Sequence, residues 1–122
     1  CAMLGGGSVK CWGANSYGQL GNSSTKDSDD PVSVQDLRGA VDLGVGRNHA
    51  CVIASATATD TRIECWGLNS DGQLGNGTND DSLEPAAVTG DHEFTQLSAG
   101  RYFTCGLDPD GAARRTTSVR PT

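Results

Sequence analysis

The chain has 122 residues, of which 17 are Gly and 5% are aromatic, and its formal net charge is −6. A chain of this length with so few bulky apolar residues is expected to form one domain with short elements and many tight turns. The negative charge disfavours nucleic-acid binding, because Lys and Arg neutralise phosphates, and no apolar run or signal segment predicts a membrane span.

One stretch occurs twice and organises the whole chain. Cys11 to Asn22 matches Cys65 to Asn76 at ten of twelve positions. Sliding the sequence by 54 residues extends the match to Cys11–Cys51 against Cys65–Cys105, with 18 identities in 41 positions. Such a repeat predicts stacked equivalent units of about 50 residues, the size of a propeller blade.

Within each unit the local signals predict strands and turns, because no 3.6-residue apolar stripe of helical length occurs. In chain order, the predicted strands span residues 8–12, 31–34, 40–45, 48–53, 62–66, 85–88, 94–99 and 102–107. Two of them open with Pro31 or Pro85, which suits an edge strand because Pro has no N–H for a ladder. Four strands per unit leave sheet faces uncovered, so each unit needs neighbours.

The repeated pattern Cys-Trp-Gly-x-Asn-x-x-Gly-Gln-Leu-Gly, with a following Pro-x-x-Val and Gly-x-x-x-x-Cys, resembles the regulator of chromosome condensation repeat. The resemblance covers residues 1 to about 114. It implies a seven-bladed β-propeller of four-stranded antiparallel blades, used in different members for guanine-nucleotide exchange, chromatin docking or inhibition of secreted enzymes. The Cys-paired units are most similar to those of exported bacterial members.

We therefore expect an all-β fold, a partial β-propeller with two four-stranded antiparallel blades and part of a third. The expected units are residues 1–50, 51–104 and 105–114. Residues 115–122 match nothing in the repeat and are expected to form a disordered, non-repeat tail. We expect further propeller blades to be missing from this chain.

The cysteines predict two hairpin disulfides. A hairpin with its turn centred on Gly6 places Cys1 opposite Cys11. Cys51 and Cys65 repeat this arrangement in a hairpin that is longer by four residues, with residues 55–60 in its loop. By the same spacing Cys105 would pair with position 115, which is Arg, so Cys105 is predicted to be a free thiol.

Paired cysteines predict an oxidising compartment, outside the cell or at its surface. The alternative is a cytosolic protein in which all 5 cysteines are reduced and pack as small apolar residues. No pair has the Cys-x-x-Cys spacing of a zinc site. Trp12 and Trp66, which occupy equivalent positions, are predicted to be buried between blades.

No cofactor, metal or catalytic site is predicted. Two acidic loops, one with Asp27, Asp29 and Asp30 and the other with Asn79, Asp80 and Asp81, lack the Gly and terminal Glu of an EF-hand, so we interpret them as solvated turns; the alternative is that they bind calcium. For catalysis only His49 is worth checking, in combination with Asp42, Asp60 or Ser55. Its counterpart is Phe103, which favours a packed strand position, and we therefore predict that the chain is not an enzyme.

Loop residues that differ between the units are free to bind a partner. Together with two arginines at a strand-to-strand turn, they nominate Tyr17, Arg47, Arg101 and Tyr102 as partner-binding residues. The alternative is that both arginines cap carbonyls within a blade. We predict a non-catalytic scaffold that recognises a protein or a glycan; the alternatives are a guanine-nucleotide exchange regulator in the full-length parent and a structural surface-repeat segment.

Overall fold

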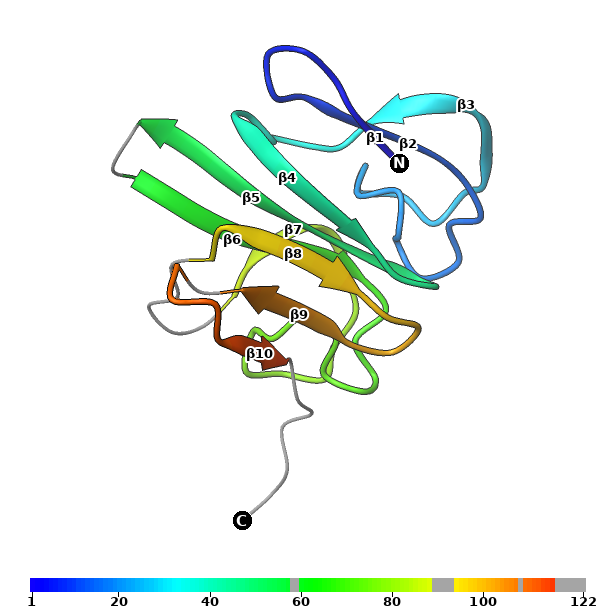
Figure 1. Cartoon of the computed structure of the whole chain (residues 1–122). Helices are drawn as coiled ribbons and strands as arrows, with labels where there is room; N and C mark the ends of the chain where they lie inside the picture. The colour runs from blue at the N-terminus through cyan, green and yellow to red at the C-terminus, as the bar shows by residue number, and fades with distance from the viewer. Residues whose placement is uncertain (58–59, 89–93, 108, 116–122) are drawn as a thin grey trace.

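The computed structural model describes residues 1–57, 60–88, 94–107 and 109–115, and strands are its only regular secondary structure (Figure 1). Ten strands of this part of the chain form three antiparallel sheets. The first sheet contains β1 (Ala2–Met3), β2 (Val9–Gly13) and β3 (Ser28–Ser33). The middle sheet contains β4 (Ala40–Val45), β5 (His49–Thr57), β6 (Asp60–Gly67) and β7 (Ser82–Ala87). The third contains β8 (Gln96–Ala99), β9 (Thr104–Leu107) and β10 (Ala113–Arg115).

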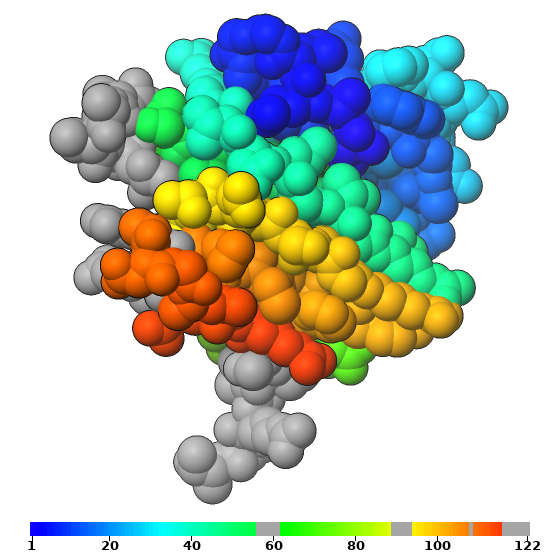
Figure 2. Space-filling view, viewed as in Figure 1, coloured from blue at the N-terminus to red at the C-terminus, as the bar shows by residue number. Residues whose placement is uncertain are grey.

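The predicted all-β, partial-propeller architecture is confirmed, and the described strands are divided three, four and three among the sheets. The sequence repeat is offset from the sheets by one strand. β4 follows β3 in the first unit but pairs with β5 of the second, and β8 follows β7 but pairs with β9. Each unit therefore supplies three strands to one sheet and its fourth to the next. Figure 2 shows β4 and β8 running side by side across one face of the molecule.

The strands that contain Pro lie at sheet edges, as predicted: β3 pairs only with β2, and β7 only with β6. Both begin three residues before Pro, at Ser28 and Ser82. The predicted loop over residues 55–60 is wrong, because Ser55 pairs with Thr61 and Thr57 pairs with Asp60. β-Branched Thr favours the extended backbone that continues this ladder. Residues 58 and 59 lie outside the described part.

Two apolar clusters join the three sheets. Between the first and middle sheets, fully buried Trp66 of β6 packs with Val9, Cys11 and Leu20. Its Nε1 donates a hydrogen bond to the Gln19 carbonyl at 3.0 Å. Between the middle and third sheets, buried Ile53, Ile63 and Leu74 pack against Phe94 and Leu97. Each sheet thus buries against its neighbour a face that it cannot cover alone.

The prediction of burial is confirmed for Trp66 and wrong for Trp12, whose side chain is 48% exposed. Trp66 reaches the preceding sheet, where Gly21 lies so close that an added Cβ would be 2.9 Å from the indole. Trp12 occupies the same repeat position on the first sheet. Among the described residues no sheet precedes the first, so nothing equivalent to Gly21 and Leu20 covers this ring.

The loop that follows each Cys-Trp-Gly is organised by one fully buried asparagine. The Oδ1 atom of Asn69 accepts a hydrogen bond from Leu74 N at 2.9 Å, and its Nδ2 donates to the carbonyls of Thr78 and Asp80 at 2.9 and 3.0 Å. The Asp81 carboxylate accepts from Asn69 N at 2.9 Å.

Asn15 makes the same pattern in the first unit. It bonds Leu20 N, the Ser24 and Lys26 carbonyls and Asp27. Asp27 and Asp81 therefore accept hydrogen bonds from backbone amides, and the repeated Asn and Asp residues fix the conformation of the loops.

Candidate functional site

The two predicted disulfides are present. Cys1 is bonded to Cys11 and Cys51 to Cys65, with Cα–Cα distances of 3.9 and 4.0 Å. Cys105 is a free thiol, and the register places Arg115 directly opposite it, as the spacing predicted. The Arg115 guanidinium lies 4.4 Å from the centre of the Phe103 ring. Each disulfide cross-links the two sides of its own hairpin. Both lie in the interior, since Cys11, Cys51 and Cys65 are fully buried.

Two hairpin tips lie next to each other at one end of the molecule (Figure 1). One joins β4 to β5 through residues 46–48, and the other joins β8 to β9 through residues 100–103. They approach closely: a Cβ added to Gly46 would lie 2.6 Å from the Gly100 carbonyl oxygen. The offset between repeat and sheet places equivalent turns of successive units side by side.

Three of the four predicted partner-binding residues occupy these tips, and we call Arg47, Arg101 and Tyr102 the tip surface. Both arginines are exposed, and Tyr102 is 45% exposed. The Arg101 guanidinium lies 5.1 Å from the centre of the Tyr102 ring, a cation–π contact that holds the two side chains together. The fourth residue, Tyr17, is also exposed and lies in the loop after β2.

A pocket of about 150 Å³ lies beside the tip surface, between the first sheet and the β4–β5 tip. Arg47 contributes to it, and Tyr17 does not. The lining residues are Cys1, Trp12, Ala14, Gln19, Leu20, Val45, Gly46, Arg47 and His49. Sequence reasoning missed Trp12 and Gln19 as site residues. Both belong to the repeated stretch, whose recurrence favoured a purely architectural interpretation.

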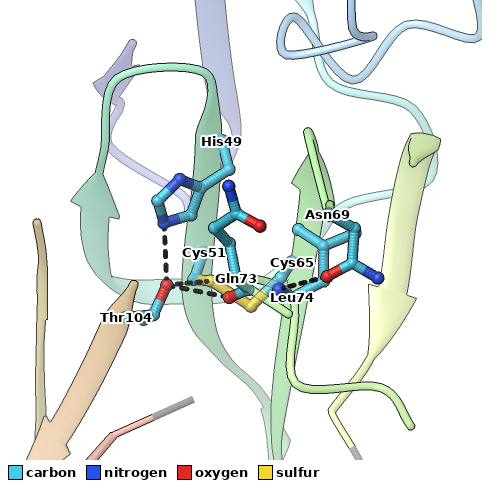
Figure 3. Close-up of a disulfide and its surroundings, with 7 residues drawn as sticks. All are labelled: His49, Cys51, Cys65, Asn69, Gln73, Leu74 and Thr104. Atoms are coloured by element: carbon cyan, nitrogen blue, oxygen red, sulfur yellow. Dashed lines mark hydrogen bonds between the residues drawn. A yellow bond between two sulfur atoms is a disulfide. The ribbon is translucent and has the colours of Figure 1, made fainter. Parts of the chain in front are cut away.

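His49 is the one buried titratable side chain that lines the pocket, and Figure 3 shows its surroundings. Its Nε2 lies 2.9 Å from the Thr104 hydroxyl of the third sheet, which in turn donates to the Gln73 carbonyl at 3.1 Å. The sulfur of the disulfide-bonded Cys51 lies 3.4 Å from the same hydroxyl. The contact between His49 and Thr104 thus links β5 of the middle sheet to β9 of the third.

Burial lowers the pKa of His49 below its ordinary value of 6.5, while the nearby Phe103 carbonyl acts in the opposite direction. The lowered pKa favours the neutral imidazole at physiological pH. One of its three candidate partners for catalysis, Asp42, is engaged elsewhere, because its carboxylate accepts from Leu97 N at 2.7 Å. The packed strand position predicted for His49 is confirmed.

Over the residues that the structure describes, no group of three or more His, Cys, Asp or Glu is placed to hold a metal ion. In the same part of the chain, no helix is long and apolar enough to cross a membrane. The polar residues at this end of the molecule include two arginines, a tyrosine and Gln19, which are suited to hydrogen bonding and ion pairing with a partner.

The comparisons with known proteins agree on the family and the fold. The model of the regulator of chromosome condensation (RCC1) repeat matches residues 6–53 and 65–107. The chain is similar to the probable E3 ubiquitin-protein ligase HERC3 of Homo sapiens, with 35% identity over 107 residues, 84% of this chain and 10% of that protein. It is 28% identical to human E3 ubiquitin-protein ligase HERC2 over 114 residues, 90% of this chain and 2% of the relative.

Among solved structures, yeast RCC1 (Prp20) bound to Kap60 superimposes with a TM-score of 0.72 and 23% identity, over 88% of this chain and 25% of the other. Human WBSCR16 gives a TM-score of 0.68 and 23% identity, over 84% of this chain and 27% of that one. The chain thus spans about a quarter of these structures and a tenth or less of the two ligases. With the family model matching well over half of its residues, the chain belongs to the regulator of chromosome condensation (RCC1) repeat family.

Proposed function

We propose that this chain is a non-catalytic binding module that recognises a protein partner through the tip surface. The observation that carries the proposal is the meeting of Arg47, Arg101 and Tyr102, from two different sheets, on adjacent exposed tips. Arg and Tyr are the residue types that dominate binding energy at protein interfaces. Neither arginine makes an ion pair with another residue in the described ranges, so both guanidiniums are available to a partner.

Similar proteins support a role in protein binding. Yeast Prp20, whose fold this chain shares, has been crystallised with Kap60 and characterised for its binding to Gsp1p and histones. We infer for this chain only the general property, the binding of a macromolecule, because it covers a quarter of that structure. The disulfides support a working place in an oxidising compartment, outside the cell or at its surface.

The test is a capture experiment with matched charge reversals. The purified chain and its R47E and R101E variants are used to capture proteins from extracellular fluid of the source, with R38E as a control because Arg38 is exposed in the β3–β4 connection. We expect one identified partner to be retained by wild type and R38E and lost by both tip variants, while circular dichroism and melting temperature stay unchanged. Retention of the partner by both tip variants would refute the proposal.

Two further measurements separate this function from its alternatives. Accelerated nucleotide release from a GTPase at substoichiometric amounts of the chain would favour the exchange-factor alternative instead. Counting thiols in the protein isolated from its source tests the compartment: one reactive thiol is expected, and five would place the chain in the cytosol.

A further inference from the structure

The pocket beside Arg47 is built to accept an anionic group, and we infer that it binds a carboxylate of the partner. This inference rests on the proposed function and names the chemistry that the binding site recognises. The volume of about 150 Å³ equals several water molecules or one side chain of moderate size. Its walls include Leu20 and Val45, so a group that enters it exchanges water for a partly apolar environment.

Two of the residues that line this pocket, Gln19 and Arg47, carry side-chain hydrogen-bond donors. Gln19 Oε1 accepts from Tyr17 N at 2.9 Å, which fixes the amide orientation and leaves Nε2 as a donor. Within the described residues no hydrogen bond is made by this Nε2 or by the Arg47 guanidinium. An unpaired donor beside a guanidinium calls for an acceptor that carries negative charge, and Arg matches the geometry of a carboxylate.

His49 adds neither positive charge nor an accessible hydrogen-bond acceptor to the pocket. Its Nε2 lies 2.9 Å from the Thr104 hydroxyl, and burial lowers its pKa, which favours the uncharged ring. Its Nδ1 has no hydrogen-bond partner among the described residues but is buried out of reach of solvent. None of the lining residues is Asp or Glu, so the lining offers no accessible carboxylate to compete for Arg47.

The second unit has no equivalent of this pocket-lining glutamine, because its counterpart is buried. Gln73, the repeat equivalent of Gln19, is fully buried, and its Oε1 likewise accepts from a backbone amide, that of Asp71. The Nε2 atom of Gln73 is enclosed beneath the third sheet, whereas Gln19 is only half-buried at the pocket. Identical residues therefore have different roles, and only the Gln19 amide is reachable.

The test is a titration of the whole chain, labelled with ¹⁵N, followed by nuclear magnetic resonance. The probes are N-acetylglutamate α-methylamide, which carries a side-chain carboxylate, N-acetyl-leucine, which mimics a C-terminal carboxylate, and the neutral N-acetylglutamine methylamide. We expect saturable shifts of the Gln19 side-chain amide and the Arg47 Nε–H with one or both carboxylates, and about tenfold weaker binding of the neutral probe. The stronger of the two carboxylates identifies the source in the partner.

Variants make the titration decisive. R47Q should weaken carboxylate binding about tenfold, Q19E should weaken it as well by placing a like charge in the pocket, and R38Q should bind as wild type. Equal binding of the neutral probe, undiminished binding by R47Q, or no saturable shift at up to tens of millimolar would overturn the inference. The two proposals can fail separately. If the titration gives one of these results while R101E still loses the partner in the capture experiment, the carboxylate-binding pocket is refuted but partner binding by the tip surface is retained.

Discussion

Replacing Arg115 by Cys should create a third hairpin disulfide. Position 115 faces Cys105 in the ladder, as Cys65 faces Cys51, and that native pair has Cα atoms 4.0 Å apart. The new bond would close a loop of sequence separation 10, the same as for Cys1 and Cys11. Loop-closure entropy alone gives about 2.8 kcal/mol for such a loop.

The change also removes the contact between Arg115 and the Phe103 ring, which is worth about 0.5 to 1 kcal/mol at an exposed site. The net gain in unfolding free energy is therefore about 2 kcal/mol, which corresponds to a rise in Tm on the order of 8 °C. Calorimetry measures the rise, and thiol titration should find no reactive thiol in R115C. R115S is the matched control and should lose about 0.5 to 1 kcal/mol.

Two outcomes would refute this reasoning. Two reactive thiols in oxidised R115C would mean that the third hairpin does not keep the register seen here. A closed disulfide without a rise in Tm would mean that β9 and β10 do not take part in the cooperative unfolding transition.

The remaining predictions concern the joints between sheets and the loops. Trp66→Phe should cost about 1 to 3 kcal/mol of unfolding free energy in urea titration, since it removes a buried ring and the bond to the Gln19 carbonyl, whereas Trp12→Phe at the 48%-exposed position should cost less than about 0.5 kcal/mol. Asn69→Ala should cost about 2 to 4 kcal/mol in the same assay, because Leu74 N and two carbonyls lose their partner; a cost as small as that of Trp12→Phe would contradict the role assigned to it. The lowered pKa of His49 means that the unfolded state binds its proton more readily, so stability should fall as pH drops below about 6.5, and His49→Phe should abolish this part of the pH dependence.

The sequence repeat and the alternation of apolar and polar residues predicted most of the strands. Both signals depend only on residues within a strand or a hairpin, and not on which sheet packs against it. The hairpin disulfides followed from spacing alone, since residues equidistant from a turn face each other in an antiparallel ladder. The extension of β5 and β6 was missed because Ala and Thr continue a ladder without an apolar signal. The early start of β3 and β7 was missed because Asp, Ser and Glu disfavour strands intrinsically, and pairing with β2 or β6 overrides that preference.

The pocket could not have been predicted, because its members come from Cys1, from β2 with the loop after it and from the β4–β5 hairpin, which meet only in the fold. Trp12 and Trp66 are identical in sequence context, and so are Gln19 and Gln73. Their exposure differs because each depends on the neighbouring sheet and not on its own unit. The two arginines were identified correctly as surface residues, but the meeting of their tips follows from the one-strand offset, which no local pattern reveals.

That offset also bears on how such arrays grow. A unit copied by gene duplication carries three strands for its own sheet and one that completes the next, as β4 does for the middle sheet. An inserted copy therefore receives a strand from the unit before it and donates one to the unit after it, provided that the strand register and the inter-sheet contacts, such as Trp66 against Gly21, are kept. Because each repeat carries the residues for both of its junctions, an array of these units can change length by whole repeats without leaving an internal strand unpaired.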